Sequence, residues 1–543
     1  MEQIEFNLLD EPWIRVMTQD CAVCERSLTQ TLTQSHEFLR LAGETPTQDV
    51  AVLRLLLAVL HTVFYRVDAD GEDDPVEDAS TAVARWRELW SAGRLPEKPI
   101  ADYLDTWHDR FWLFHPERPF YQTPGADIGT AYEASKLNGE LSESSNKPRL
   151  FPSRTGENKW SLSYAEAARW LVTLMGFDDS STKVQTGTGS GWLGQHVNLY
   201  ASGKNLFETL MLNLVFLRDG KEVWEEDNAP AWENPEPCKP VKRAICVPDN
   251  QAALLTLQSR RVLLKRKDDR VTGYATTGGD YFADGGTNAF AEQMTQWRSV
   301  KKSKTAPDEF RPVQLDPKNP NKQLWRDFET IMDGAAGKHR TGVASWINTL
   351  KRKGAIKGMV VHFSSVGVTY KNNSSIDEII ADHVDFHAHL FDDAGAPWNA
   401  LIQSMITKTE DGARCIRLFA AGLCRAAGCK SEDEEQRAVQ EYYAAVDIPF
   451  REWLLSIDPE MGDGEELLNE KERQWRRRAY SIAMRQGEKM LSRAGQAAFA
   501  GRWVEDKKGG RKLCCSSGEF NAFAGRISRC FGIRAAKKEE ADD

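Results

Sequence analysis

The segment Ala381–Leu390 (ADHVDFHAHL) gathers histidine and aspartate, side chains that bind transition metals. His383 and His387 are four residues apart, so one turn of a helix would direct both at a single ion, with Asp385 as a carboxylate ligand. This set supports one hypothesis, a metal-dependent nuclease. The segment lacks the glutamate of an HExxH motif. We favour the simpler interpretation, a helix at a domain junction with ordinary exposed histidines.

The stretch Gly189–Gly194 (GSGWLG) matches the letters G-x-G-x-x-G of a dinucleotide-binding loop. Such a loop follows an apolar strand, whereas the preceding residues Asp178–Gln185 are polar. No Walker lysine follows, and no serine lies in a G-x-S-x-G elbow. We therefore predict no cofactor, no metal and no enzymatic activity. The glycines from Gly187 to Gly194 would still let the backbone approach a nucleic acid closely.

Long cationic side chains gather at two places in a chain whose formal net charge is −10. One cluster contains Arg260, Arg261, Lys265, Arg266 and Lys267, and the other contains Arg298, Lys301, Lys302 and Lys304. Such clusters can contact phosphate, and they can equally be solvated loops. A third segment, Gly367–Ile376, combines an aromatic ring, a cation, amides and hydroxyls. These groups can read base edges, including those in the minor groove.

The length and composition limit the class of protein. A chain of 543 residues exceeds the size of a single hydrophobic core, so we expect two or more domains. The negative net charge argues against a protein that simply coats nucleic acid. We find no 18-residue apolar run and no signal-peptide pattern, and we expect a cytoplasmic protein without a membrane span. The ten cysteines are expected to be reduced and structural.

The predicted fold class is α+β, with a large mixed α/β domain over residues 1–395 and a C-terminal four-helix bundle over residues 396–543. In the first domain, helices are predicted at Leu53–Phe64, Tyr164–Met175 and Leu206–Val215, strands at Arg261–Lys265 and Gly358–Phe363, and long loops at Gln122–Asn158, Asp178–Asn205 and Arg270–Ala306. In the second, helices are predicted at Asn399–Ala427, Asp433–Ile457, Glu465–Ala494 and Ser517–Phe531. Pro449 is expected to kink or break the second of these four.

The segment Phe111–Thr123 (FWLFHPERPFYQT) is dense in aromatic residues. Its prolines, Pro116 and Pro119, disfavour a continuous helix or a central strand. We interpret the segment as a rigid turn that braces the long polar stretch after it.

This motif and four others resemble the family of the large subunit, CasA, of the type I-E CRISPR surveillance complex Cascade. The other four, in chain order, are Phe6–Val16 (FNLLDEPWIRV), Lys136–Leu137 followed by Ser142–Asn146, the glycine-rich Gly187–Gly194, and Tyr370–Asn373. The order is that of the family, and the resemblance covers nearly the whole chain.

The resemblance implies a non-catalytic role in antiviral defence. The family's large subunit reads the protospacer-adjacent motif (PAM) on double-stranded DNA from the minor groove and helps to start strand separation, which leads to an R-loop. It also recruits the helicase-nuclease. The implied partners are the other Cascade subunits, the CRISPR guide RNA, the target double-stranded DNA and the helicase-nuclease effector, with no membrane. Base pairing with the guide then reads the sequence.

The resemblance also implies functional residues. Those expected to contact DNA at the PAM are Gly187, Gly189, Ser190, Gly191, Tyr370, Lys371, Asn372, Asn373, Ser374 and Ser375, with Lys265, Lys267 or Lys301 as substitutes for the family's DNA-contacting lysine. Those expected in the loop that attaches guide RNA and neighbouring subunits are Gln122, Thr123, Lys136, Ser142, Ser144, Ser145 and Asn146. Ser374 stands where the family often has glutamine, so the PAM preference is expected to differ.

Two alternatives remain open beside this interpretation. One is the metal-dependent nuclease built on His383 and His387. The other is a pure protein scaffold that holds a partner through its bundle and never contacts DNA.

Overall fold

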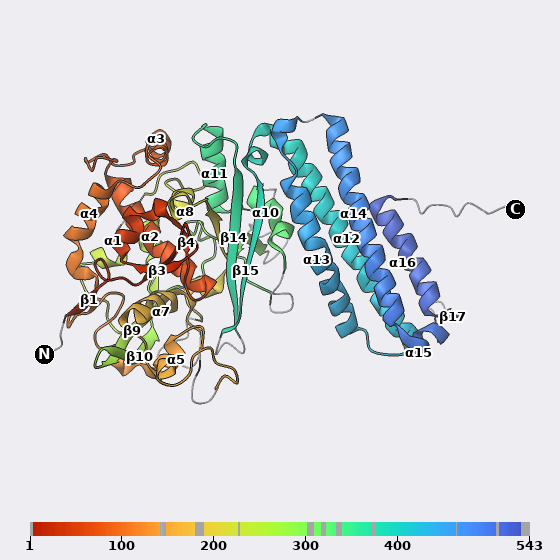
Figure 1. The fold of residues 1–543 in the computed structure, drawn as a ribbon, viewed down its shortest axis with the longest axis horizontal. Helices are drawn as coiled ribbons and strands as arrows, with labels where there is room; N and C mark the ends of the chain where they lie inside the picture. Colours follow the sequence, from red (N-terminus) through yellow and green to blue (C-terminus); the bar gives the residue numbers. More distant parts are fainter. Residues whose placement is uncertain are drawn as a thin grey trace. The chain divides into compact units, whose positions relative to one another are not determined.

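Figure 1 shows the computed structural model of the chain. It describes residues 4–141, 143, 148–179, 189–225, 229–300, 309–316, 322–332, 339–370, 376–462, 464–505 and 510–533. The chain divides into two compact units. The first contains residues 1–357 and 361–384, and the second contains residues 358–360 and 385–543. Residues 385–395, which the sequence analysis assigned to the first domain, therefore belong to the second unit, because the turns that precede the first bundle helix pack with the bundle.

The first unit mixes short sheets with helices, as the predicted α+β class requires. Its helices are α1 (Leu28–Thr33), α2 (Pro46–Arg66), α3 (Ala79–Ser91), α4 (Glu97–Thr106), α5 (Ala134–Leu137), α6 (Glu157–Trp160), α7 (Tyr164–Phe177), α8 (Leu206–Asn213), α9 (Gln251–Leu255), α10 (Phe328–Met332) and α11 (Gly342–Arg352). Its strands are β1 (Glu5–Asn7), β2 (Ile14–Thr18), β3 (Val23–Arg26), β4 (Phe38–Leu41), β5 (Trp112–Phe114), β6 (Thr130–Glu133), β7 (Asn198–Ser202), β8 (Arg243–Ile245), β9 (Arg260–Lys267), β10 (Arg270–Gly278), β11 (Asp280–Phe282), β12 (Trp297–Val300), β13 (Glu309–Pro312), β14 (Val360–Tyr370) and β15 (Ile376–His387), the last two crossing the division.

Helix α2 forms the core of the first unit. Thr45 caps its N-terminus by accepting a hydrogen bond from the amide of Gln48, and the predicted helix Leu53–Phe64 lies within it. By length and composition alone α2 could cross a membrane, but 94% of its most apolar 18 residues are buried within the protein. Its apolar residues therefore pack against the rest of the unit, including α7 and α9.

A buried ion pair ties α2 to a distant part of the chain. Arg54 donates two hydrogen bonds of 2.9 Å to the carboxylate of Glu292, and both side chains are almost completely buried. The indole of Trp192 donates to the same carboxylate at 2.8 Å. Burial by itself would raise the pKa of Glu292, but Arg54, His196 and the Trp192 hydrogen bond lower it to about 2.

The segment Arg270–Ala306, predicted as a long loop, contains β10, β11 and β12. Strand β10 is the centre of a sheet with the order β6-β10-β9, and it pairs antiparallel with both neighbours. Its residues (RVTGYATTG) are small and polar, yet most of them are buried. The prediction is wrong because pairing on both edges satisfies this backbone, and that pairing involves residues far away in the sequence.

The second unit contains the predicted helical bundle. Its elements are α12 (Ala396–Ala427), α13 (Glu432–Leu455), α14 (Glu465–Arg493), α15 (Gly495–Ala500), β16 (Arg502–Glu505), β17 (Arg511–Cys514) and α16 (Ser516–Phe531). Helix α12 contacts α13, α14 and α16, and the four long helices lie side by side in Figure 1. The fold class predicted from the sequence is thereby confirmed.

Trp475 of α14 explains how the bundle tolerates a proline. Its buried indole donates a hydrogen bond of 3.0 Å to the hydroxyl of Thr409 on α12, and its ring meets Phe450 of α13 edge to face at 4.9 Å. Helix α13 is continuous through Pro449, so of the predicted kink or break the break does not occur. Phe450, next to the proline, is buried and packs against Trp475.

The ion pair of Glu292 predicts a specific response to acid. A carboxyl group whose pKa falls from 4.5 to about 2 on folding contributes its full stabilisation above about pH 4.5, on the order of 3 kcal/mol, and loses it as the pH falls towards 2. Glu292→Gln cannot ionise, so it is expected to be less stable than the wild type at pH 7 and to approach the wild type near pH 2. Denaturant unfolding at a series of pH values measures this gap, and a gap that stays constant with pH would contradict the assignment.

Candidate nucleic-acid interface

The buried guanidinium of Arg260, on β9, holds both ends of the glycine-rich segment. Its Nε donates to the carboxylate of Asp178 at 2.7 Å. Its Nη2 donates to the carbonyl of Asp179 at 2.8 Å and to that of Gly189 at 2.9 Å. Asp179 and Gly189 border residues 180–188, which lie outside the described residues together with the predicted Gly187. One side chain therefore bonds to the residues on both sides of segment 180–188.

Residues 189–191, which follow segment 180–188, are held by close backbone contacts. Gly189 has φ +75°, a conformation that favours glycine. A Cβ on Gly191 would lie 2.3 Å from the carbonyl oxygen of Gly176, so only glycine fits there without movement of the backbone. The amide of Gly191 donates to the carbonyl of Asp178 at 2.8 Å, and Gln195 donates to the carbonyl of Ser190 at 2.7 Å. Gly189, Ser190 and Gly191 thus form a rigid base for the segment before them.

Tyr370 brings a second predicted DNA-reading segment to the same place. It is the last residue of β14, and its hydroxyl donates to the carbonyl of Phe177 at 2.7 Å. A Cβ on Gly194 would lie 1.9 Å from this hydroxyl, so the ring fits tightly over that glycine. Burial raises the pKa of Tyr370. Residues 371–375, which carry Lys371, Asn372, Asn373, Ser374 and Ser375, follow directly and lie outside the described residues.

The contacts of the Tyr370 side chain all lie within the first unit. The hydroxyl is engaged with the backbone of Phe177, and the ring packs on Gly194. Tyr370 is therefore held by Phe177 and Gly194, directly before residues 371–375.

The predicted attachment loop begins at Lys136, beside the residues that Arg260 contacts. Lys136 of α5 forms a buried ion pair with Asp179. Glu143 is also buried, and its carboxylate accepts hydrogen bonds from the amine of Lys159 at 2.9 Å and from the amide of Arg149 at 3.0 Å. Lys136 consequently balances the charge of Asp179, while Ser142, Ser144, Ser145 and Asn146 lie outside the described residues.

Gln122 and Thr123, which were predicted to belong to the attachment loop, are buried in the first unit. The side chain of Gln122 donates to the carbonyl of Leu113 at 2.6 Å and accepts from the amide of Leu264 at 2.9 Å. The amide of Thr123 donates to the carbonyl of Val262, and its side chain is fully buried. Both residues fasten the aromatic turn to β9.

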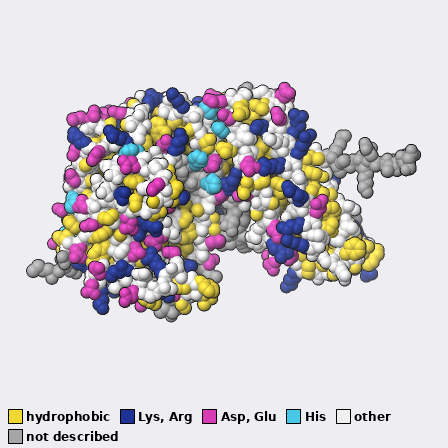
Figure 2. All heavy atoms as spheres, viewed as in Figure 1, with side chains coloured by type: hydrophobic (Ala, Val, Ile, Leu, Met, Phe, Trp, Pro, Cys, Tyr) yellow, Lys and Arg dark blue, Asp and Glu magenta, His cyan; other side chains and the backbone are white. Residues whose placement is uncertain are grey.

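The basic cluster on β9 separates into paired and exposed cations. Arg261 binds the carboxylate of Asp280 at 2.5 Å, and Arg266 pairs with Glu5. Lys265 and Lys267 are exposed, two residues apart on the same face of the strand. Among the predicted DNA-contacting lysines, these two are described and open to solvent, whereas Lys301 lies outside the described residues. Figure 2 shows acidic and basic side chains interspersed over the face that it draws.

The proposed nuclease residues do not share a metal site. His383, Asp385 and His387 lie on strand β15, where the sequence analysis expected a helix. Four residues of extended chain separate the first histidine from the last by about 13 Å, too far for one ion. The error has a simple cause: a spacing of four residues brings side chains together only on a helix.

The residues that organise the site were not identified from the sequence. Asp178 and Asp179 are bonded to Arg260, and Ser259 accepts a hydrogen bond from the amide of Trp192, yet no motif marks these three residues as part of a site. The one usable signal was the pair of aspartates directly after the predicted helix Tyr164–Met175. Their partner Arg260 is more than 80 residues away, so the pairing itself cannot be read from local patterns.

The described fold is that of the CRISPR-associated large subunits. The model of the family described as CRISPR-associated protein Cse1 matches residues 7–486, so the chain belongs to this family and the predicted resemblance is confirmed.

Individual relatives agree with this assignment. CasA/Cse1 of Thermus thermophilus is 38% identical over 234 residues, which is 42% of each chain, so the match spans less than half of that curated relative. The crystal structure of Thermobifida fusca Cse1 has a TM-score of 0.80 and 28% identity, covering 98% of this chain and 99% of that one. A chain of a structure described as a CRISPR RNA-guided surveillance complex shares the fold, with a TM-score of 0.69, 17% identity and coverage of 97% and 99%.

Removing the hydroxyl of Tyr370 should weaken the contact between Tyr370 and Phe177, which lie next to segments 371–375 and 180–188. Tyr370→Phe keeps the ring over Gly194 but leaves the carbonyl of Phe177 without this donor, at a cost of about 1 kcal/mol. We expect amide hydrogen exchange in a peptide spanning residues 176–194 to become about fivefold faster. Tyr480→Phe, in the bundle, serves as the matched control. Unchanged exchange in the Tyr370 variant would show that the hydroxyl does not hold this region.

Proposed function

We propose that this protein is the large subunit of a CRISPR RNA-guided surveillance complex and that it recognises the PAM on double-stranded DNA. In this role it reads the motif from the minor groove, helps to begin strand separation and R-loop formation, and recruits the helicase-nuclease. The family membership supports the assignment to such a complex. A cytoplasmic location is part of the proposal.

One observation carries the DNA-reading part of the proposal: the described residues that border two segments with DNA-compatible chemistry contact one another. Arg260 holds the ends of residues 180–188, and Tyr370, directly before residues 371–375, donates to Phe177 within the same region. A glycine-rich backbone and a turn with amides and hydroxyls would then act on the same short stretch of DNA.

The charge distribution supports contact with a limited length of DNA. Arg260 and Lys136 are neutralised by Asp178 and Asp179, so the anchoring cluster carries little net charge. Exposed cations such as Lys265 and Lys267 would supply phosphate contacts, in a protein that is acidic as a whole. This arrangement suits recognition of a short motif while base pairing with the guide RNA reads the rest.

The segment between Lys136 and Asn146 is proposed to contact the guide RNA and neighbouring subunits. Lys136 and Glu143 are paired inside the protein, so this contact would depend on Ser142, Ser144, Ser145 and Asn146. The aromatic turn, fastened through Gln122 and Thr123, would hold this segment in place.

Substitutions in the turn after Tyr370 test the DNA-reading role. Lys371→Ala and Asn373→Ala, each in the reconstituted complex, are expected to weaken binding of a PAM-containing duplex by about 1–3 kcal/mol at matched salt if a base-edge contact is lost. Loss of a phosphate contact by Lys371→Ala would reduce the salt slope by about one. Lys353→Ala, an exposed lysine at the end of α11, is the control. Affinities that equal the control for both variants would favour the pure scaffold.

The absence of catalysis is tested separately. We expect plasmid DNA to stay intact when it is incubated with the purified protein and Mn²⁺, and to be degraded only after the helicase-nuclease is added to the full complex. Agarose gel electrophoresis of the plasmid distinguishes the two outcomes. Cleavage by the protein alone that is abolished in His383→Ala would revive the nuclease alternative.

A further inference from the structure

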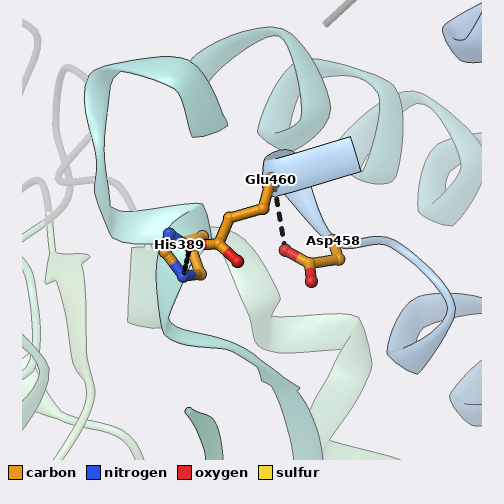
Figure 3. Close-up of side chains that lie close together, drawn as sticks. All are labelled: His389, Asp458 and Glu460. Carbon is orange, nitrogen blue, oxygen red and sulfur yellow. Dashed lines mark hydrogen bonds and ion pairs between the residues drawn. The ribbon is translucent and has the colours of Figure 1, made fainter. Parts of the chain in front are cut away.

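Two clusters of reactive side chains lie in the second unit, outside the region proposed to bind DNA. Figure 3 shows the first, His389, Asp458 and Glu460, whose polar atoms all lie within 4.8 Å of one another. Nε2 of His389 lies 2.9 Å from the carboxylate of Glu460. A Cβ on Gly358 would lie 2.1 Å from the same nitrogen, so the backbone of Gly358 fills the space that a metal ion would need there. This cluster therefore joins two turns by polar contacts and does not accommodate a metal ion.

The second cluster is a pair of thiols between two helices of the bundle. Cys415 lies on α12 and Cys530 near the end of α16, and these helices contact each other. Both thiols are free and half-buried, so a small molecule can reach them from solvent. The largest influence on the pKa of each thiol is a hydrogen bond with the other. The fold thus brings together two cysteines that are far apart in the sequence.

The end of α16 is fixed in place, which keeps Cys530 beside its partner. The thiol of Cys530 donates to the carbonyl of Lys408 on α12 at 3.5 Å. The carbonyl of Phe531 accepts a hydrogen bond of 2.6 Å from Nε of Arg476 on α14, and the Phe531 side chain is fully buried. Contacts to two other helices therefore hold the residue that would react with Cys415.

The environment of the pair makes the two thiols chemically different. The hydrogen bond from Cys530, together with the charges of Arg526 and Arg529, lowers the pKa of Cys415 to about 7, although burial and Asp411 raise it. The pKa of Cys530 is raised, chiefly by Cys415. Nε and Nη2 of Arg526 are buried without a hydrogen-bond partner among the described residues, so a thiolate would give this cation a counter-charge. A thiolate beside a thiol is the arrangement of redox-sensitive cysteine pairs.

We propose that Cys415 and Cys530 form a modification site at which a peroxide creates a disulfide between α12 and α16. The thiolate of Cys415 attacks one oxygen of the peroxide, the O–O bond breaks, and Cys415 becomes a sulfenic acid. The thiol of Cys530 then attacks this sulfur, which forms the S–S bond and releases water. With hydrogen peroxide, two thiols and one peroxide give one disulfide and two waters, and the two electrons lost by sulfur reduce the peroxide.

The disulfide would fasten the helix α16 covalently to α12, the helix that contacts α13, α14 and α16. This site lies in the second unit and does not depend on the proposed role on DNA. A result on the cysteines therefore leaves that role untouched, and failure of DNA binding would leave the cysteine pair untouched.

The test identifies which cysteines become linked in the full chain. Hydrogen peroxide is added to dilute protein, remaining thiols are blocked with iodoacetamide, and the protein is digested with trypsin without a reductant. Cleavage after arginine releases Cys415–Arg417 (CIR) and Cys530–Arg534 (CFGIR), each with a single cysteine. We expect mass spectrometry to find these peptides joined, with the mass of two hydrogens missing, and to find them separate after reduction with dithiothreitol.

Variants test the order of the two steps. In Cys530→Ser no link can form, and we expect Cys415 to stop at the sulfenic acid, which dimedone labels. Cys246→Ser changes an exposed cysteine of the first unit and is the matched control, expected to form the same link as the wild type. Without peroxide at pH 7, iodoacetamide should alkylate Cys415 at least about tenfold faster than Cys530, because only a thiolate reacts.

Three results would overturn the proposal, provided that circular dichroism shows each protein to be folded. The first is a peroxide-treated wild type without a link between Cys415 and Cys530. The second is a link from either of them to another cysteine, within the chain or between two chains. The third is a sulfenic acid that dimedone finds on Cys530 of the wild type and not on Cys415 of Cys530→Ser.

Discussion

The described part of the proposed DNA-reading region depends on the buried guanidinium of Arg260. It bonds to one carboxylate and to backbone carbonyls on both sides of residues 180–188. A cation without solvent must have all of its donors satisfied, and the surrounding chain is arranged to satisfy them. Asp178 supplies the charge, and Gly189 approaches closely enough to supply a carbonyl. The ends of the glycine-rich segment are thereby fixed by the requirements of a single buried charge.

A second buried charge connects this region to the core. Glu292 accepts from Arg54 of α2 and from the indole of Trp192, which directly follows Gly191. The amide of Trp192 also donates to the hydroxyl of Ser259, next to Arg260. Helix α2 and the residues that follow the glycine-rich segment are therefore joined through one carboxylate. Such a connection transmits rigidity, because neither charge can move without losing its partner.

The elements with strong local periodicity were predicted well. The helices around Leu53–Phe64 and Tyr164–Met175 and the four helices of the bundle lie where the apolar spacing placed them, because an amphipathic pattern can be read within a single segment. The strands between Arg270 and Ala306 were missed, and the histidines of β15 were assigned to a helix. Strand β10 pairs with the distant strand β6, and β15 pairs with the preceding strand β14; in both cases local residue types do not reveal the pairing.

The sequence by itself determined the family, because motifs such as Phe6–Val16 and Phe111–Thr123 are contiguous and keep their order. It also indicated which segments have residues suited to nucleic acid. Only the tertiary structure decided which of those side chains are available: Arg260, Arg261, Lys136 and Tyr370 are engaged inside the protein, while Lys265 and Lys267 are exposed. The physical reason is that the environment of a charge depends on its partners, and here those partners come from distant parts of the chain.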